Sequence, residues 1–307
     1  MPLFLNKKSK MKKAVLLFAL FVGVIAMSYS QQTYSPYYKV AEFDTDIADV
    51  TAKVKQAIVA GGFDVIGEYH PGDNNDLYVI CYTSKQLGDL SLEFEDRGAL
   101  ASVLKAGLVK KDGKVTLSIL NPEYMFLAYW GNQLDGQETQ ITAMSDKAKS
   151  SFSSLGELTA FGGSLDRDDL IGYHYKMMMP YFDDPDDLED YDSFEEGLKI
   201  IRANLNKGKG NTVKVYEQVF ADKKVAIFGV GLLNAEEGEA FFLPIVGEDH
   251  IANLPYEIIL QDDEATMLAG KYRIALFWPE LTMGTFMKIM STPGDIEDVM
   301  EGLCEDD

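Results

Sequence analysis

Two stretches of this chain nearly repeat each other, 157 positions apart. One runs from Lys114 to Glu123 and the other from Lys271 to Glu280, and both end on a Pro-Glu pair. Apolar residues alternate in each stretch, which is typical of a half-buried strand, and proline ends a strand because it cannot donate to the ladder. A duplication explains the repeat, so the sequence predicts two copies of one fold, each with a strand at this place.

The elements expected around these stretches follow the same order in the two halves. The first half predicts a strand over 37–43, a helix from Ile47 that ends at Gly61-Gly62, a hairpin over 64–82, a helical patch over 98–106, the strand that ends at Pro122, and a helix over 123–130. The second half predicts a strand over 173–179, a helix opened by the capping box of Ser193 and Glu196, a hairpin over 212–231, and the strand that ends at Pro279. This order predicts an α+β fold of two tandem related domains, 31–162 and 163–307, each an antiparallel sheet backed by helices.

The first thirty residues have the pattern of a signal peptide. Five lysines precede an apolar run from Ala14 to Met27, and a small-polar exit follows. The run is shorter than the roughly twenty residues that span a bilayer, and no later run reaches that length. Lipidation would need a cysteine at the cleavage point, and the two cysteines are Cys81 and Cys304. The sequence predicts an exported protein, periplasmic or extracellular, with no membrane span after cleavage.

The chain is strongly acidic. Its formal charge is −21, and loss of the signal segment removes five lysines and no acidic residue, which gives −26. Such a field repels nucleic acid and anionic lipid, because binding to a phosphate backbone depends on cationic neutralisation. The sequence therefore excludes nucleic acid as a partner. Two interpretations of the acid excess stay open, namely solubility of an exported protein and a role that involves cations.

Several phrases of the chain resemble the DUF302 family, small α+β domains of unknown function. The phrase from Leu117 to Met125 is similar to the strand-end phrase of that family. Four others resemble a longer, two-copy exported subgroup: 161–163, 173–175, 179–182 and 254–258. The resemblance spans roughly residues 37–300 and implies a helix-backed sheet, similar in outline to the TATA-box-binding-protein-like class. Trp278 stands where the first copy has Asn121, and the family carries no established activity, so the resemblance transfers no catalytic residue.

Two places in the second half are candidate metal sites. On the strand predicted over 173–179, His174 and Met178 share one face and offer ligands to a soft metal such as copper. Core filling by methionine is the alternative. The acidic run that follows offers carboxylates to calcium, and its candidate ligands are Asp183, Asp184, Asp186 and Asp187. The run lacks the glycine and the spacing of an EF-hand, and a solvated charge run before a helix N-terminus is the alternative.

Aromatic residues gather at corresponding ends of the two halves and are the candidate ligand-binding residues: Tyr124, Tyr129, Trp130, Phe277 and Trp278. Two interpretations stay open for them. They pack in the core or between the domains, or they line an apolar cleft between helix and sheet that is open to a small molecule or a partner segment.

No residue pattern in the chain indicates catalysis. The sequence has neither a Gly-x-Ser-x-Gly elbow nor a His-Glu-x-x-His motif, and its three histidines are isolated from one another. We therefore expect an exported, non-catalytic tandem-domain protein that binds an unknown small molecule or protein. The alternatives are a periplasmic protein that binds calcium or copper, and an enzyme of unrecognised type. The sequence indicates neither a cofactor nor an oligomeric state.

Overall fold

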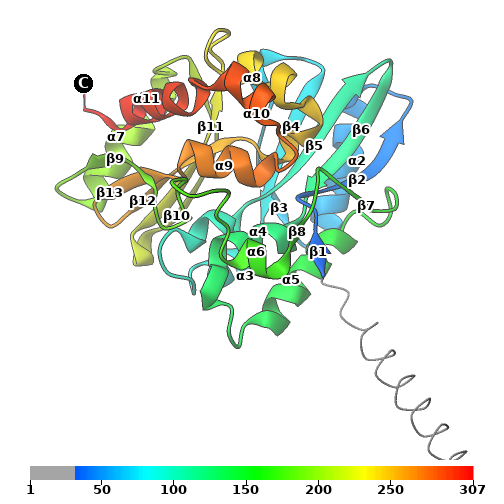
Figure 1. Cartoon of the computed structure of the whole chain (residues 1–307), viewed down its shortest axis with the longest axis horizontal. Coiled ribbons are helices and arrows are strands. Elements are labelled where there is room, and N and C mark those ends of the chain that lie inside the picture. Colours follow the sequence, from blue (N-terminus) through cyan, green and yellow to red (C-terminus); the bar gives the residue numbers. More distant parts are fainter. Residues whose placement is uncertain (1–31, 307) are drawn as a thin grey trace, which may run out of the picture. The chain divides into compact units, whose positions relative to one another are not determined.

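Two antiparallel β-sheets form the centre of the fold (Figure 1). The computed structural model describes residues 32–306, so the predicted signal peptide over 1–30 lies outside the described residues. Contacts divide the chain into two units after Thr33, and the fold described below is that of the unit that begins at Tyr34. Between residues 32 and 306, no helix is long and apolar enough to cross a membrane.

The first sheet has the strand order β3-β4-β5-β6-β2-β7, with antiparallel neighbours throughout. The strands of the first half are β1 (Thr33–Tyr34), β2 (Tyr37–Phe43), β3 (Asp64–Tyr69), β4 (Leu77–Thr83), β5 (Leu104–Lys111), β6 (Lys114–Leu120) and β7 (Thr159–Phe161). Its helices are α2 (Ile47–Ala60), α3 (Lys85–Ser91), α4 (Pro122–Trp130) and α5 (Glu138–Ser150), with the 3₁₀ turns η1 (Pro71–Asp73), η2 (Gly98–Ser102) and η3 (Gly131–Gln133). The helix predicted from Ile47 is confirmed as α2, which packs Val50, Val54 and Ile58 against this sheet.

The second sheet has the strand order β10-β11-β12-β13-β9, again antiparallel. The strands of the second half are β8 (Leu165–Asp166), β9 (Asp186–Asp190), β10 (Thr212–Phe220), β11 (Val225–Leu232), β12 (Tyr256–Gln261) and β13 (Glu264–Met267). Its helices are α6 (Arg167–Ile171), α7 (Phe194–Lys207), α8 (Glu239–Val246), α9 (Gly270–Phe277), α10 (Met283–Phe286) and α11 (Thr292–Cys304), with the turns η4 (Ala221–Lys223), η5 (Glu248–Asn253) and η6 (Met287–Ile289). The cap predicted for α7 is present, because the Ser193 hydroxyl accepts a hydrogen bond from the Glu196 amide at 3.3 Å.

The two halves share one order of elements. The first half runs β2-α2-β3-β4-α3-η2-β5-β6-α4 and the second runs β9-α7-β10-β11-α8-η5-β12-β13-α9. In both sheets the first strand of this shared order pairs with the last strand of the order, since β2 pairs with β6 and β9 pairs with β13. The predicted α+β class, with antiparallel sheets backed by helices, is therefore confirmed. The division into two domains at residue 162 stays a prediction.

The strand predicted over residues 271–279 is wrong, because this segment is the helix α9. Apolar spacing does not separate strand from helix here, since α9 is buried on nearly all sides. Its lysine, arginine, alanine and leucine residues favour a helix, and Pro279 follows the helix as a stop signal instead of ending a strand. The sequence repeat at an offset of 157 therefore does not join equivalent elements.

A shift of 148 residues aligns α4 with α9, which stand at the same place in the order of elements. Under this shift, Tyr124 corresponds to Tyr272 and Ala128 to Leu276. The Tyr124 hydroxyl donates to the Leu276 carbonyl at 2.7 Å, and the Tyr272 hydroxyl donates to the Ala128 carbonyl at 3.3 Å. The two hydrogen bonds are thus reciprocal: each half donates to the other from the corresponding tyrosine. Contacts across the two-fold axis of a symmetric dimer are reciprocal in the same way.

One further element prediction is wrong and another is right in part. Residues 173–179 form a loop with a turn, and the place beside β13 is taken by β9, which comes from the acidic run that follows. The helical patch predicted over 98–106 is confirmed over Gly98–Ser102 as the 3₁₀ turn η2, but β5 begins at Leu104. In both cases the pairing of strands decides the local structure, which residue spacing does not reveal.

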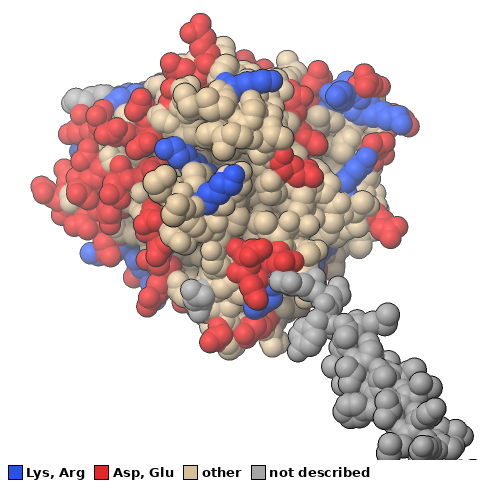
Figure 2. Space-filling model, in the orientation of Figure 1, with Lys and Arg blue, Asp and Glu red and all other residues tan. Residues whose placement is uncertain are grey.

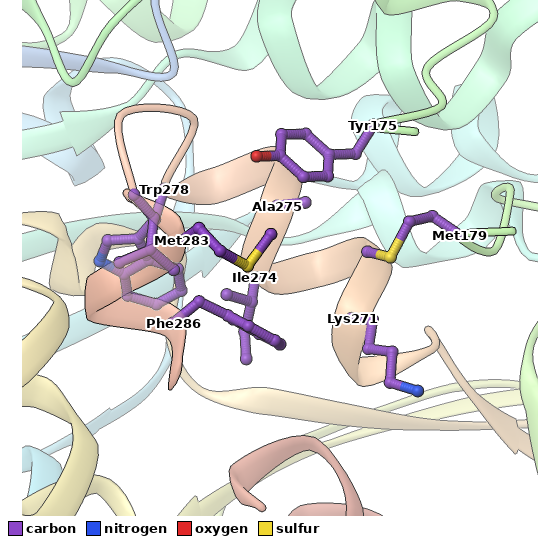
Figure 3. Close-up of a pocket in the computed structure, with 9 residues that line it drawn as sticks. Tyr175, Met179, Lys271, Ile274, Ala275, Trp278, Met283 and Phe286 are labelled. Atoms are coloured by element: carbon purple, nitrogen blue, oxygen red, sulfur yellow. The ribbon is translucent and has the colours of Figure 1, made fainter. Parts of the chain in front are cut away.

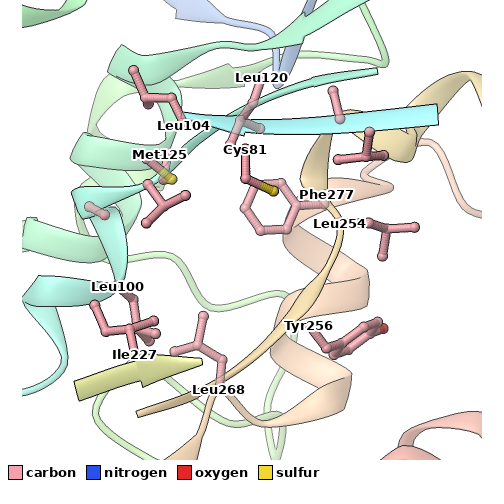
Figure 4. Close-up of a cluster of buried hydrophobic side chains, with 14 of the residues drawn as sticks. Cys81, Leu100, Leu104, Leu120, Met125, Ile227, Leu254, Tyr256, Leu268 and Phe277 are labelled. Carbon is pink, nitrogen blue, oxygen red and sulfur yellow. The ribbon is translucent and has the colours of Figure 1, made fainter. Parts of the chain in front are cut away.

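One hydrophobic cluster extends through both halves (Figure 4). Its members include Cys81 and Leu104 from strands of the first sheet and Tyr256 and Phe277 from the second half. A buried ion pair also joins the sheets, because the Lys105 ammonium on β5 contacts the Glu257 carboxylate on β12. The two halves therefore share their core, and this core is the rigid support of the surface described next.

Candidate functional site

The five aromatic residues predicted to bind a ligand are all buried. None of Tyr124, Tyr129, Trp130, Phe277 and Trp278 is more than 4% exposed. The Trp130 ring stacks between Phe94 and Phe126, with ring centroids 4.1 and 4.3 Å away. Most of the predicted set therefore has a packing role, and Trp278 is the member that lines a surface cavity.

The candidate copper ligands lie in the loop 172–185, between α6 and β9. The His174 ring stacks on Tyr181 at 4.0 Å between centroids, and its Nε2 atom lies 2.8 Å from the Met179 carbonyl oxygen. Met178 has a left-handed backbone, with φ of 71°, and is 94% exposed. Because residues 173–179 form no strand, His174 and Met178 do not share a strand face.

The candidate calcium ligands are divided between the loop and β9. Asp183 and Asp184 lie in the loop, whereas Asp186 and Asp187 are successive residues of a paired strand. The Asp186 carboxylate accepts a hydrogen bond from the Gly270 amide at 3.0 Å. Within residues 32–306, no group of three or more His, Cys, Asp or Glu side chains is arranged to hold a metal ion. Metal binding stays a prediction from the sequence.

Sequence reasoning missed a group of exposed methionines. They come from the loop 172–185 and from the turn of α10 and η6: Met177 (84% exposed), Met178 (94%), Met283 (55%), Met287 (57%) and Met290 (61%). Exposed tyrosines of the same loop accompany them, namely Tyr175 and Tyr181. The spacing of Met283, Met287 and Met290 was the available signal, because positions i, i+4 and i+7 of a helical turn lie on one side.

An apolar surface cavity of about 70 Å³ lies between these two segments and α9 (Figure 3). The loop contributes Tyr175 and Met179, α9 contributes Ile274 and Trp278, and α10 contributes Met283 and Phe286. The Thr282 hydroxyl caps α10 by accepting a hydrogen bond from the Thr285 amide at 3.2 Å, which fixes the start of this wall. The cavity is sized for one apolar side chain, since pockets for whole small molecules measure about 300–1,000 Å³.

A second, wider cavity of about 710 Å³ adjoins the first. Met179 and Lys271 line both cavities, so the two are neighbours on the surface. Met178 and Met290 line the second cavity together with the carboxylates of Asp184, Asp186 and Glu297. We call the two cavities and their walls, the loop 172–185, α9 and the segment 281–297, the methionine groove.

The wide end of the methionine groove is electrostatically negative. Burial raises the pKa of Asp186 above its usual value, against the lowering by the Gly270 amide and by Lys271. The pKa of Glu297 is raised by burial and by the nearby charges of Asp186 and other carboxylates. Figure 2 shows a related division at larger scale, with mostly uncharged surface over α10, basic atoms over α9, and acidic atoms gathered at the left over β9 and β13.

A third cavity, of about 670 Å³, lies on the first sheet and has a mixed lining of apolar and polar residues. Lys111, Ser118 and Asp249 are among the polar ones. The Asp249 carboxylate contacts the His250 Nδ1 atom at 2.8 Å, and this hydrogen bond holds the pKa of Asp249 below its usual value. The His250 ring itself is buried against Tyr37, Phe161 and Trp278, so the structure gives it a packing position.

Neither thiol is a nucleophile available to solvent. Cys81 and Cys304 are free and buried. Burial raises the pKa of Cys304 to about 12 and raises the pKa of Cys81 further above its ordinary value. Since the thiolate is the reactive form, both side chains are inert at neutral pH.

Comparison of this chain with models of known protein families gives no match, and comparison with curated proteins gives none at a significant level. The resemblance to the DUF302 family therefore stays a prediction, and the methionine groove must be interpreted from its own chemistry.

Proposed function

We propose that this protein is an exported binding protein of DUF302-like type that acts without catalysis, and that the methionine groove takes up an apolar segment of a partner protein. The observation that carries the proposal is an apolar cavity lined by the exposed Met283, beside a second cavity lined by the exposed Met178 and Met290. Contiguous apolar surface on a soluble protein marks interaction sites, whereas single exposed apolar residues are normal.

Methionine suits such a surface physically. Its side chain is unbranched and polarisable, so it adapts to partners of different shape and makes favourable contacts with aromatic rings. The groove combines these adaptable walls with a rigid floor, because Ile274 and Trp278 belong to the shared core. A partner side chain that enters the 70 Å³ cavity would be enclosed by apolar atoms, which is the geometry of an anchor residue at an interface.

The lining of the narrow cavity supports binding over catalysis. Lys271 and Tyr175 are the lining residues with an ionisable group, and Figure 3 shows the Lys271 ammonium directed away from the methionine and aromatic side chains. Acid–base or nucleophilic chemistry needs paired groups within hydrogen-bond distance. The groove offers apolar contact area instead.

A labelled amphipathic peptide tests the proposal. The peptide carries leucines at helical positions i, i+4 and i+7 and neutral polar residues elsewhere, and binding is followed by fluorescence anisotropy. We expect saturable binding to the purified protein, weakened at least about tenfold by Met283→Glu, because a carboxylate at the rim of the cavity opposes burial of the anchor.

Val59→Glu is the matched control, because Val59 is also an exposed apolar residue, at 63%, but lies on α2. This variant should bind the peptide as the unaltered protein does. Equal binding by the Met283→Glu variant and the unaltered protein, or absence of saturable binding to either, would contradict the proposal.

A further inference from the structure

We propose that the partner segment is cationic as well as apolar, with a lysine or arginine beside its anchor residue that enters the wide, acidic end of the methionine groove. This inference rests on the proposed function, since it names the chemistry of the segment that the groove receives. It is carried by the arrangement of the two neighbouring cavities, one apolar and one lined by three carboxylates and a single lysine.

The carboxylates that line the wide cavity outnumber the basic residues that line it. Lys271 is the one basic residue in its lining, against Asp184, Asp186 and Glu297. Neither Asp186 nor Glu297 has an ion-pair partner within 4.0 Å in residues 32–306. A guanidinium or ammonium group brought by a partner would supply the missing counter-charge in a partly desolvated place, where charge pairs are stronger than in water.

The neighbouring elements add to the negative field. Asp298 and Glu301 on α11 act on Glu297, and Asp187 on β9 acts on Asp186. Lys271 lies where the two cavities meet, and at the apolar end the Lys176 ammonium sits over the Tyr175 ring at 4.9 Å. The groove therefore has an apolar end and an acidic end. A segment with an apolar residue and a cationic residue can match both ends in one orientation only.

The distance between the two ends limits the spacing of the partner residues. Met179 and Lys271 border both cavities, so anchor and cation must be neighbours on the surface of the segment. Side chains three or four positions apart on a helix are such neighbours, with about 5–6 Å between their Cβ atoms. We thus infer an apolar residue followed or preceded by lysine or arginine at that spacing.

The net charge of the chain also disfavours binding of a second copy of the chain in the methionine groove. The chain carries a formal charge of −21, and two copies would repel each other at the approach of their acidic faces. A cationic partner is instead attracted from a distance and then oriented by the acidic end.

Three peptides with the same leucine anchors test the inference. They differ in the residue four positions from the central anchor, which is lysine, glutamine or glutamate, and a scrambled lysine peptide controls for general attraction to an acidic protein. We expect affinity to fall in the order lysine, glutamine, glutamate, with at least about tenfold between the first and the last. The difference should shrink in high salt, because the acidic end is only partly buried.

Variants of the protein locate the effect. Glu297→Lys should abolish the preference for the lysine peptide, and the milder Asp184→Asn should reduce it. Asp135→Lys changes the net charge as much as Glu297→Lys does, but Asp135 is exposed between η3 and α5 and should leave the preference unchanged. Circular dichroism on each variant checks that it is folded.

The possible outcomes separate the two proposals. Equal binding of the three peptides, with loss of all of them in the Met283→Glu variant, would overturn the inference about charge and leave the proposed function standing. A preference that Asp135→Lys and Glu297→Lys change alike would also overturn it, since the attraction would then be general. Failure of every peptide to bind, or self-association that Met283→Glu removes, would overturn both proposals.

Discussion

Two carboxylates are buried among the described residues, and their surroundings differ. Glu257 contacts the Lys105 ammonium and lies 3.6 Å from the Arg273 guanidinium, so opposite charges surround it. Glu239 is fully buried with neutral donors, because it accepts hydrogen bonds from the Tyr69 hydroxyl at 2.8 Å and from the Gly72 amide at 2.9 Å. Burial outweighs these hydrogen bonds and raises the pKa of Glu239 to about 7. Glu239 is therefore a residue whose protonation changes near neutral pH.

The raised pKa of Glu239 makes the stability of the fold depend on pH. The folded state holds this proton more tightly than the unfolded chain, so the stabilisation is fully present below about pH 4.5 and is lost as pH rises through about 7. The free energy of unfolding should fall by up to about 3 kcal/mol over this window. Glu239→Gln cannot titrate and should remove that part of the decline. Denaturant unfolding of both proteins between pH 4.5 and 8 measures the difference, and parallel curves would contradict the pKa.

At the scale of one element, α7 shows a sequence signal that the structure confirms. Ser193→Ala removes the hydroxyl that accepts from the Glu196 amide and should lower the free energy of unfolding by about 1 kcal/mol. Ser154 is an exposed serine outside the helices and strands, so Ser154→Ala is the control. Urea denaturation at fixed pH compares the two variants. A loss no larger than that of the control would mean that the cap does not stabilise α7.

Sequence patterns predicted the elements that local signals mark and failed for those that tertiary packing decides. Apolar runs on either side of turn residues predicted the hairpins of β3 with β4 and β10 with β11, and spaced apolar residues predicted α2. α9 was predicted as a strand because its apolar residues alternate, and its burial on nearly all sides leaves no helical period in the sequence. β9 was missed because its acidic residues disfavour a strand, and only pairing with β13 makes it one.

The methionine groove could not be derived from the sequence for a related reason. A methionine is usually a core residue, so its type does not reveal whether it is exposed. Exposure of Met177 and Met178 follows from the loop conformation, and that of Met283 follows from the position of α10 over α9. The aromatic candidates were predicted to line a binding cleft, but all of them are buried. The core that buries Tyr124 and Trp130 is built by both halves of the chain.

At the scale of the whole molecule, the two halves depend on each other. They share one hydrophobic cluster, the ion pair of Lys105 with Glu257, and the reciprocal hydrogen bonds of Tyr124 and Tyr272. Separation at the predicted boundary, residues 31–162 and 163–307, would expose this core and leave buried charges without partners. We expect the joined chain to unfold in one cooperative thermal transition and neither half alone to show one. A cooperative transition of an isolated half by calorimetry would show that it is an independent domain.

Methionine-methyl NMR tests the central claim, that the methionine groove is the binding surface, most directly. The chain has 13 methionines, and selective ¹³C labelling of their methyl groups reports on the groove and the core in one spectrum. On titration with the lysine peptide, we predict shifts confined to the groove, at Met178, Met179, Met283 and Met290, while the buried Met125 and Met144 stay unchanged. Unchanged groove methyls in a titration that shifts Met125 or Met144, or shifts spread evenly over all methionines, would contradict the account.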